Sequence, residues 1–192
     1  MTSRATALER LAIVLASLVL SIGLIAVMSG FFQSKDQAGV SGSGPAIGQQ
    51  FPDLGDAHLQ PGELRPPYNS EPPTSGAHVP LAIARDATTL TTDQELEALE
   101  LGDIVIAYGD SQPPRELRSL QSSVAGPFTP ALAAAGQAVV LWLRPGTTGF
   151  IGLAWTRMLH VRTAGDLLKS FAERYLGQGA PAPAPTKKKK QA

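Results

Sequence analysis

Residues 137–155 read QAVVLWLRPGTTGFIGLAW and carry the clearest signal for a sheet. Gln137–Leu143 and Gly149–Trp155 are short apolar runs rich in β-branched and aromatic residues, which is the usual composition of buried strands. The five residues between them include a proline and a glycine, which favour a turn. The stretch therefore predicts an antiparallel hairpin, with Trp142 and Trp155 packed in the core.

Helix and strand signals continue upstream of this hairpin. Thr92–Glu95 has the pattern of a capping box, and it opens a short helix that ends at Gly102. Asp103–Tyr108 (DIVIAY) directly follows and reads as a third buried strand. Pro113-Pro114 then opens a second helix, whose apolar face consists of Leu117, Leu120 and Val124.

The last helix has the most regular pattern. Thr163 and Asp166 form its N-cap region, and Gly177 ends it. Its apolar stripe consists of Leu167, Leu168, Phe171, Ala172, Tyr175 and Leu176. The order loop, α, β, α, β, β, α predicts an α+β domain with a small, largely antiparallel sheet and about three helices.

An uncharged apolar run, Leu11–Phe32, precedes this domain. As a helix it would be about 33 Å long, which is enough to cross a lipid bilayer. The run is longer than the apolar part of a cleaved signal peptide, so we expect a retained transmembrane anchor. Arg4 and Arg10 precede it, and the positive-inside rule then places residues 1–10 in the cytoplasm. The sequence thus predicts a single-pass plasma-membrane protein with an extracytoplasmic domain.

The remaining boundaries follow from composition. Residues 33–48 are a Gly/Ser-rich linker, residues 49–179 are the extracytoplasmic domain, and residues 180–192 are a disordered Ala/Pro tail that contains Lys187, Lys188, Lys189 and Lys190. The lysine run either only aids solubility or contacts an anionic surface such as lipid headgroups. Nucleic acid is not an expected partner outside the cell.

The chain contains no cysteine and has a formal net charge of zero. Disulfides, thiolate metal sites and cysteine nucleophiles are therefore excluded. The charge is unevenly spread, because residues 53–110 are strongly acidic and residues 111–180 are mainly basic.

The most unusual segment is Tyr68–His78, which reads YNSEPPTSGAH. Its two prolines fix the backbone, Gly76 permits a tight bend and His78 follows at once. A rigid loop that presents a histidine suits a ligand or proton-transfer site. The alternative is a structural turn in which Thr74 and Ser75 bond to their own backbone.

This segment resembles the signature of a bacterial family of single-anchor proteins catalogued as domain of unknown function 3105. The resemblance rests on a YNSxPPTSGxH pattern and extends from about Gly48 to Gly179. It implies the domain and a ligand-binding or structural loop, but no activity. The matching positions are Tyr68, Asn69, Ser70, Pro72, Pro73, Thr74, Ser75, Gly76 and His78.

A second family segment usually reads Val-His-x-Leu-Glu-His-Gly and corresponds here to Leu96–Gly102. Glu97 and Leu101 replace its two histidines, whereas Glu100 keeps the pattern. In relatives the resemblance implies a three-histidine metal site completed by the loop histidine. Because leucine cannot coordinate a metal, this chain is interpreted as having a degenerate site. The alternative is an oxygen-rich site for a divalent transition metal, made by His78, Glu97 and Glu100.

Signatures of enzymes are sparse. The chain has no nucleophile elbow, phosphate loop or dinucleotide fingerprint, and His58 and His160 are read as isolated surface or capping residues. A triad of Ser75, His78 and a carboxylate is the one hydrolytic arrangement left open.

The leading hypothesis is a non-catalytic, membrane-tethered binding or scaffold module without a cofactor. The alternative is a metal-binding or metal-dependent protein.

Overall fold

The structure is a computed structural model, and it describes residues 46–182. The predicted anchor Leu11–Phe32 and the lysines at 187–190 lie outside the described residues. Within residues 46–182, no helix is both long enough and apolar enough to cross a membrane.

The described residues confirm the predicted α+β class, with a mixed sheet of five strands and with four helices. The strands and helices are β1 (Gln49–Gln50), α2 (Thr92–Leu101), β2 (Ile104–Tyr108), α3 (Arg115–Val124), α4 (Pro130–Ala134), β3 (Val139–Leu143), β4 (Phe150–Ala154), β5 (Arg157–Val161) and α5 (Asp166–Tyr175).

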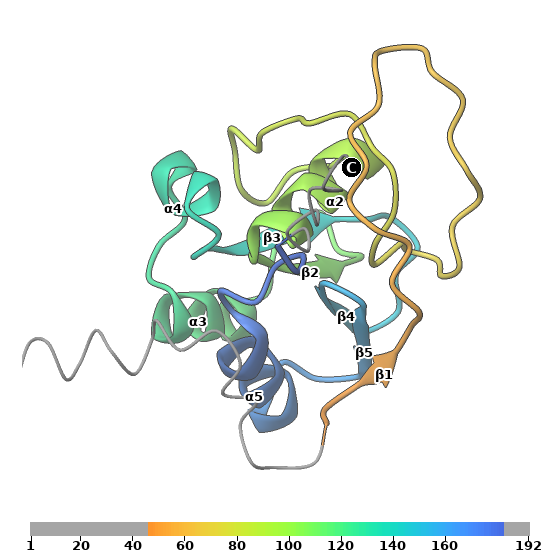
Figure 1. Ribbon diagram of the computed structural model, residues 1–192. Coiled ribbons are helices and arrows are strands. Elements are labelled where there is room, and N and C mark those ends of the chain that lie inside the picture. The colour runs from red at the N-terminus through yellow and green to blue at the C-terminus, as the bar shows by residue number, and fades with distance from the viewer. Residues whose placement is uncertain (1–45, 183–192) are drawn as a thin grey trace, which may run out of the picture. The chain divides into compact units, whose positions relative to one another are not determined.

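The sheet has the strand order β1-β5-β4-β2-β3, and helices cover both of its faces (Figure 1). All five residues of β2 are buried, as expected for a strand whose sequence is continuously apolar. On one face, α2 and α4 pack over a core that includes Trp142 and Trp155, so the predicted burial of both tryptophans is confirmed. On the other face, α3 and α5 pack over Tyr108 and its neighbours.

The predicted hairpin between β3 and β4 is wrong, although both strands exist. β2 lies between them, parallel to β3 and antiparallel to β4. The helices α3 and α4 form the crossover that a parallel β2–β3 pair requires. The six-residue loop after β3 then passes over the end of β2 at Gly109, where a Cβ atom would lie only 2.2 Å from the Thr147 carbonyl oxygen.

The hairpin of this sheet joins β4 to β5, a strand that the sequence analysis missed. Its two-residue turn is Trp155-Thr156, and Thr156 adopts a φ of +59°. Glycine or asparagine is usual at such a position, so the turn gave no recognisable signal. The turn is held by neighbouring segments, since the Thr156 N–H donates to the Thr74 carbonyl and the Phe51 N–H donates to the Thr156 carbonyl.

The helix ends differ from the prediction by a residue or so. The N-cap of α2 is Thr91, whose capping box is formed with Gln94, and Gly102 ends the helix in the left-handed conformation, as predicted. α5 is capped by Gly165 and not by Thr163 or Asp166, and its C-cap is Leu176 rather than Gly177. Leu167 is 55% exposed, so it does not belong to the buried stripe of α5.

Candidate metal centre

One face of α2 carries three carboxylates that point toward the loops before it. Asp93, Glu97 and Glu100 are spaced by four and three residues, which places them on the same side of a helix. Asp93 binds the loops directly, because its carboxylate accepts the Val79 N–H at 2.9 Å and pairs with Arg65. Glu97 and Glu100 are thereby held opposite the segment that ends in His78.

Two extended segments lie side by side opposite these carboxylates. The His78 N–H donates to the Ala57 carbonyl at 3.1 Å, and the Leu59 N–H donates to the His78 carbonyl at 2.8 Å. A parallel bridge therefore joins His58 to His78. Their rings meet edge to face, with centroids 5.5 Å apart. In Figure 1 the segment that contains His58, drawn in orange, passes beside α2.

The proline loop that carries His78 is buried. Every residue from Pro72 to His78 is buried, and the His78 side chain is 0% exposed. Tyr68 donates its hydroxyl hydrogen to the Ala77 carbonyl, and Asn69 donates its side-chain N–H to the Pro52 carbonyl. These long-range bonds fix the backbone on which His78 stands.

The predicted local bonding of Thr74 and Ser75 is also revised. The Ser75 hydroxyl accepts the N–H of Leu54, which is 21 residues away in the chain. The Thr74 hydroxyl lies 3.4 Å from that of Ser70. Ser75 thus ties the loop to the segment before it, whereas the contact of Thr74 with Ser70 stays within the loop.

Four side chains converge at this place, namely His58, His78, Glu97 and Glu100. One ligand atom from each lies within 4.8 Å of every other. His78 Nε2 is 3.2 Å from Glu100 Oε2 and 3.4 Å from Glu97 Oε2. His58 Nε2 is 3.1 Å from Glu100 Oε2. The structure therefore brings together the three residues of the predicted oxygen-rich site and adds a second histidine.

The protonation of His78 follows from its partner on the other side of the ring. Nδ1 lies 3.0 Å from the Gly76 carbonyl oxygen, which can only accept, so Nδ1 carries the proton. In the neutral ring, the lone pair of Nε2 then faces two carboxylates. His78 Nε2 and Glu97 Oε2 are both buried without a hydrogen-bond partner. Such a meeting of acceptors becomes favourable when a cation, either a second proton on the ring or a metal ion, lies between them.

His58 is the member of the cluster that the sequence analysis missed. It was interpreted as an isolated surface or capping residue, and its side chain is indeed 51% exposed. It reaches Glu100 because its backbone pairs with that of His78, not because of any helical or strand periodicity. The other isolated histidine, His160, contacts the sulfur of Met158 at 3.0 Å and lies outside the cluster.

Two further buried carboxyl groups lie outside the cluster. Burial raises the pKa of Asp103 to about 7, although its carboxylate accepts the Ala138 N–H at 2.7 Å. Burial, followed by the nearby charge of Glu71, raises the pKa of Glu95 well above its usual range, while Arg144 opposes the shift. One oxygen of each group lacks a hydrogen-bond partner. The sequence analysis included Asp103 in a buried strand, but it gave no sign that Glu95 is buried.

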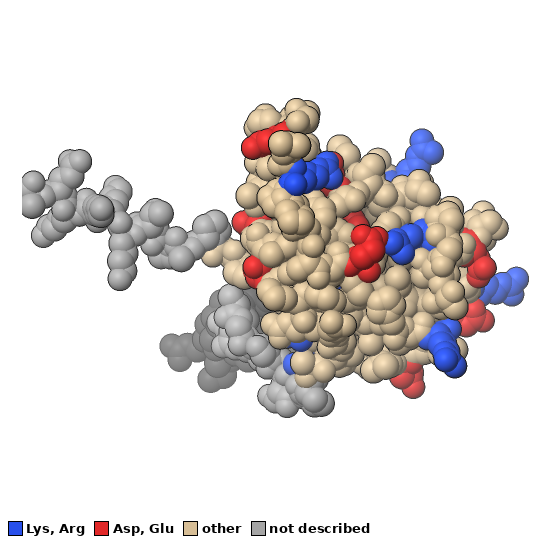
Figure 2. Space-filling view, turned by 90° about the vertical axis from the view of Figure 1, so that its right-hand side faces the viewer, with Lys and Arg blue, Asp and Glu red and all other residues tan. Residues whose placement is uncertain are grey.

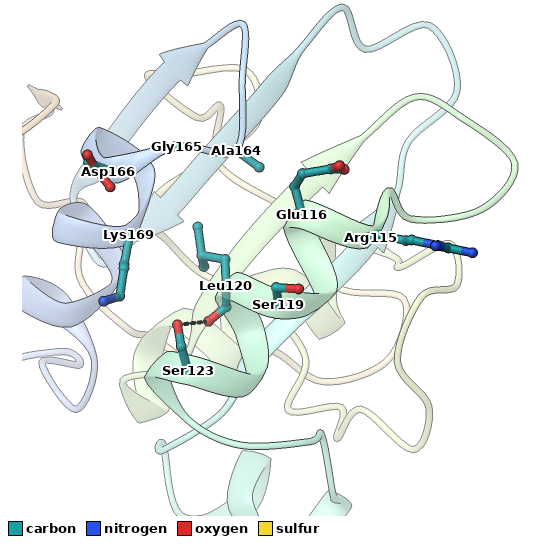
Figure 3. Close-up of a pocket in the computed structure, with 9 residues that line it drawn as sticks. All are labelled: Arg115, Glu116, Ser119, Leu120, Ser123, Ala164, Gly165, Asp166 and Lys169. Carbon is teal, nitrogen blue, oxygen red and sulfur yellow. Dashed lines mark hydrogen bonds between the residues drawn. The ribbon is translucent and has the colours of Figure 1, made fainter.

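A cavity of about 470 Å³ lies apart from the cluster, between α3 and the start of α5. Arg115, Glu116, Asp166 and Lys169 line it, so charges of both signs are mixed around it. In Figure 3 the side chain of Arg115 points away from α5, so the charged groups do not converge on one point. The face shown in Figure 2 likewise has scattered acidic and basic side chains, without a broad patch of either sign.

The fold and the cluster define an α+β domain with a candidate metal centre of two histidines and two glutamates. The family model described as "Protein of unknown function (DUF3105)" matches residues 63–191, and the chain belongs to this family. No curated protein and no solved structure matches the chain. His78, Glu97 and Glu100 lie within the matched region, whereas His58 lies upstream of it.

Proposed function

We propose that this domain binds one divalent transition metal ion through His58, His78, Glu97 and Glu100. The observation that carries the proposal is the fully buried imidazole of His78. Its Nε2 atom has no hydrogen-bond partner and faces two carboxylates. A metal ion would satisfy all of these atoms at once. The proposal takes up the metal-binding alternative of the sequence analysis and adds His58 to its ligands.

The spacing of the ligand atoms supports a small ion. Four ligands at about 2.0–2.1 Å around a tetrahedral zinc ion lie about 3.3 Å from one another. Three histidine–glutamate pairs in the cluster are 3.1, 3.2 and 3.4 Å apart, and all four ligand atoms lie within 4.8 Å of one another. Little movement is therefore needed to place an ion between them.

The donor set favours zinc over harder ions. Imidazole nitrogen is a preferred ligand of zinc and its neighbours in the transition series, whereas magnesium and calcium prefer oxygen alone. Two carboxylates also neutralise a divalent charge. The sequence-based expectation of an anchor at Leu11–Phe32 would place this centre on the extracytoplasmic side of a membrane.

Titration of the metal-free, full-length chain with zinc tests this proposal. Calorimetry should show one ion bound per chain, and a large excess of magnesium should not displace it. Glu97→Gln and Glu100→Gln should each weaken zinc binding by at least roughly tenfold, because each removes a charged ligand while keeping the shape of the side chain.

The matched control is Glu116→Gln, which makes the same change at an exposed position on α3. It should leave zinc binding unchanged. If zinc fails to bind to the wild-type chain, or if all three variants bind it equally, the cluster is not a metal centre. The scaffold hypothesis would then be favoured.

A further inference from the structure

The four candidate ligands differ in how firmly the fold holds them. His78 is enclosed, with its ring bonded to the Gly76 carbonyl and its backbone bonded on both sides. Glu97 and Glu100 stand on the last turns of α2. The C-terminal segment secures this end of the helix, since the Ala180 N–H donates to the Glu100 carbonyl and the Gly177 N–H to that of Gly102. These three ligands are fixed by packed structure.

The side chain of His58 is held less firmly, although its backbone is paired with that of His78. Its side chain is half exposed, whereas that of His78 is fully buried. The chain beyond Leu59 is exposed from Gln60 to Pro67, and Arg65 pairs with Asp93 at the start of α2. His58 therefore closes the cluster from the solvent side, and its ring can leave without disturbing the other three ligands.

We propose that His58 is a displaceable ligand, and that the coordination position it leaves accepts an imidazole-type nitrogen donor from outside the chain. This inference rests on the metal centre proposed above. Three fixed protein ligands with one exchangeable position is the arrangement by which zinc sites admit a further ligand. A closed structural site would instead hold all four ligands in packed elements.

The charge of the cluster determines the class of the external ligand. Glu97 and Glu100 together carry two negative charges when ionised, which balance a divalent ion. An incoming anion would add unbalanced negative charge beside two partly buried carboxylates. A neutral nitrogen donor adds none, and it reproduces the bond that His58 makes. A small imidazole, or a histidine presented by a partner, fits this position.

Cobalt(II) can report on this position because its visible absorption depends on the number and kind of its ligands. The full-length His58→Ala chain is expected to bind one cobalt ion, on the order of ten- to a thousandfold more weakly than the wild-type chain. Its spectrum should differ from the wild-type spectrum, since water or a vacancy replaces an imidazole. Added imidazole should restore a wild-type spectrum, whereas formate at the same concentration should not. His160→Ala is the matched control and should keep the wild-type spectrum throughout.

The possible outcomes separate the two proposals. If the wild-type chain binds no cobalt, the metal centre itself is refuted. If the wild-type chain binds cobalt and His58→Ala does not, His58 is a permanent ligand and the present inference fails alone. A cobalt-loaded His58→Ala chain that does not respond to imidazole also contradicts the inference. Equal restoration by formate would overturn the assigned class of ligand.

Discussion

Replacing His78 with alanine is expected to abolish stoichiometric zinc binding. Its Nε2 atom lies within 3.4 Å of both carboxylates, so it would be the central ligand of the proposed centre. Structural zinc sites contribute about 10–16 kcal/mol in total, so an equal share for one of four ligands is about 2.5–4 kcal/mol. Because each 1.4 kcal/mol is a factor of about ten, zinc affinity should fall by about a hundredfold to a thousandfold. Competition with a chromophoric chelator measures this loss.

The same substitution should also destabilise the metal-free chain. It leaves a cavity where the buried imidazole was and removes the hydrogen bond to the Gly76 carbonyl. Together, such changes lower the free energy of unfolding by about 2–4 kcal/mol in comparable cores. His160→Ala is the control for loss of a histidine at an exposed position, and it should retain zinc binding. Retention of full zinc affinity by a folded His78→Ala chain would contradict the proposed centre. If this variant does not fold, Glu97→Gln provides the same comparison with the side-chain shape kept.

The second large effect concerns stability as a function of pH. Asp103→Asn is expected to stabilise the chain above pH 7 and to leave it nearly unchanged at pH 4. Asparagine keeps the oxygen that accepts the Ala138 N–H, but it carries no charge into a buried position. Urea unfolding from pH 4 to pH 8, with a chelator present to exclude metal binding, measures the difference between the two chains.

The direction of this pH dependence follows from the pKa of Asp103, which burial raises from 3.8 to about 7. Between these two values the folded chain holds a proton that the unfolded chain has lost, so wild-type stability falls as the pH rises through this window. A shift of about three pKa units corresponds to about 4 kcal/mol at most.

Glu95→Gln should act in the same direction, because burial also raises the pKa of Glu95. Asp110→Asn, at an exposed loop position, should show no such trend. A parallel pH dependence in wild-type and Asp103→Asn chains would rule out Asp103 as the cause.

Local sequence patterns identified the strands better than their partners. The buried runs that became β2, β3 and β4 were recognised because each is continuously apolar. The order of these strands in the sheet was not recognised, because it depends on a helical crossover and on a loop that passes over Gly109. β5 and α4 were missed because one follows an unusual turn at Thr156 and the other has only five residues.

The sequence analysis found only part of the candidate site, because it recognised local segments but not the long-range pairing between them. His78 lies in the recognisable proline loop, and Glu97 and Glu100 lie in a recognisable helix. The three-residue spacing of the two glutamates by itself predicts that they share one face of α2. His58 joins them only through backbone pairing across 20 residues, which no local pattern records. The interpretation of a degenerate site relied on Leu101, but that side chain is 41% exposed and lies outside the cluster. The absence of a histidine at position 101 therefore leaves the four candidate ligand groups in place.

The central claim is that a metal ion joins His58, His78, Glu97 and Glu100. Anomalous X-ray diffraction from crystals of the zinc-loaded chain, recorded on both sides of the zinc absorption edge, tests it most directly. We predict one anomalous peak among these four side chains, with ligand atoms at about 2.0–2.2 Å from the ion. A zinc-loaded crystal with its peak elsewhere, or with no peak beside His78 Nε2, would contradict the account.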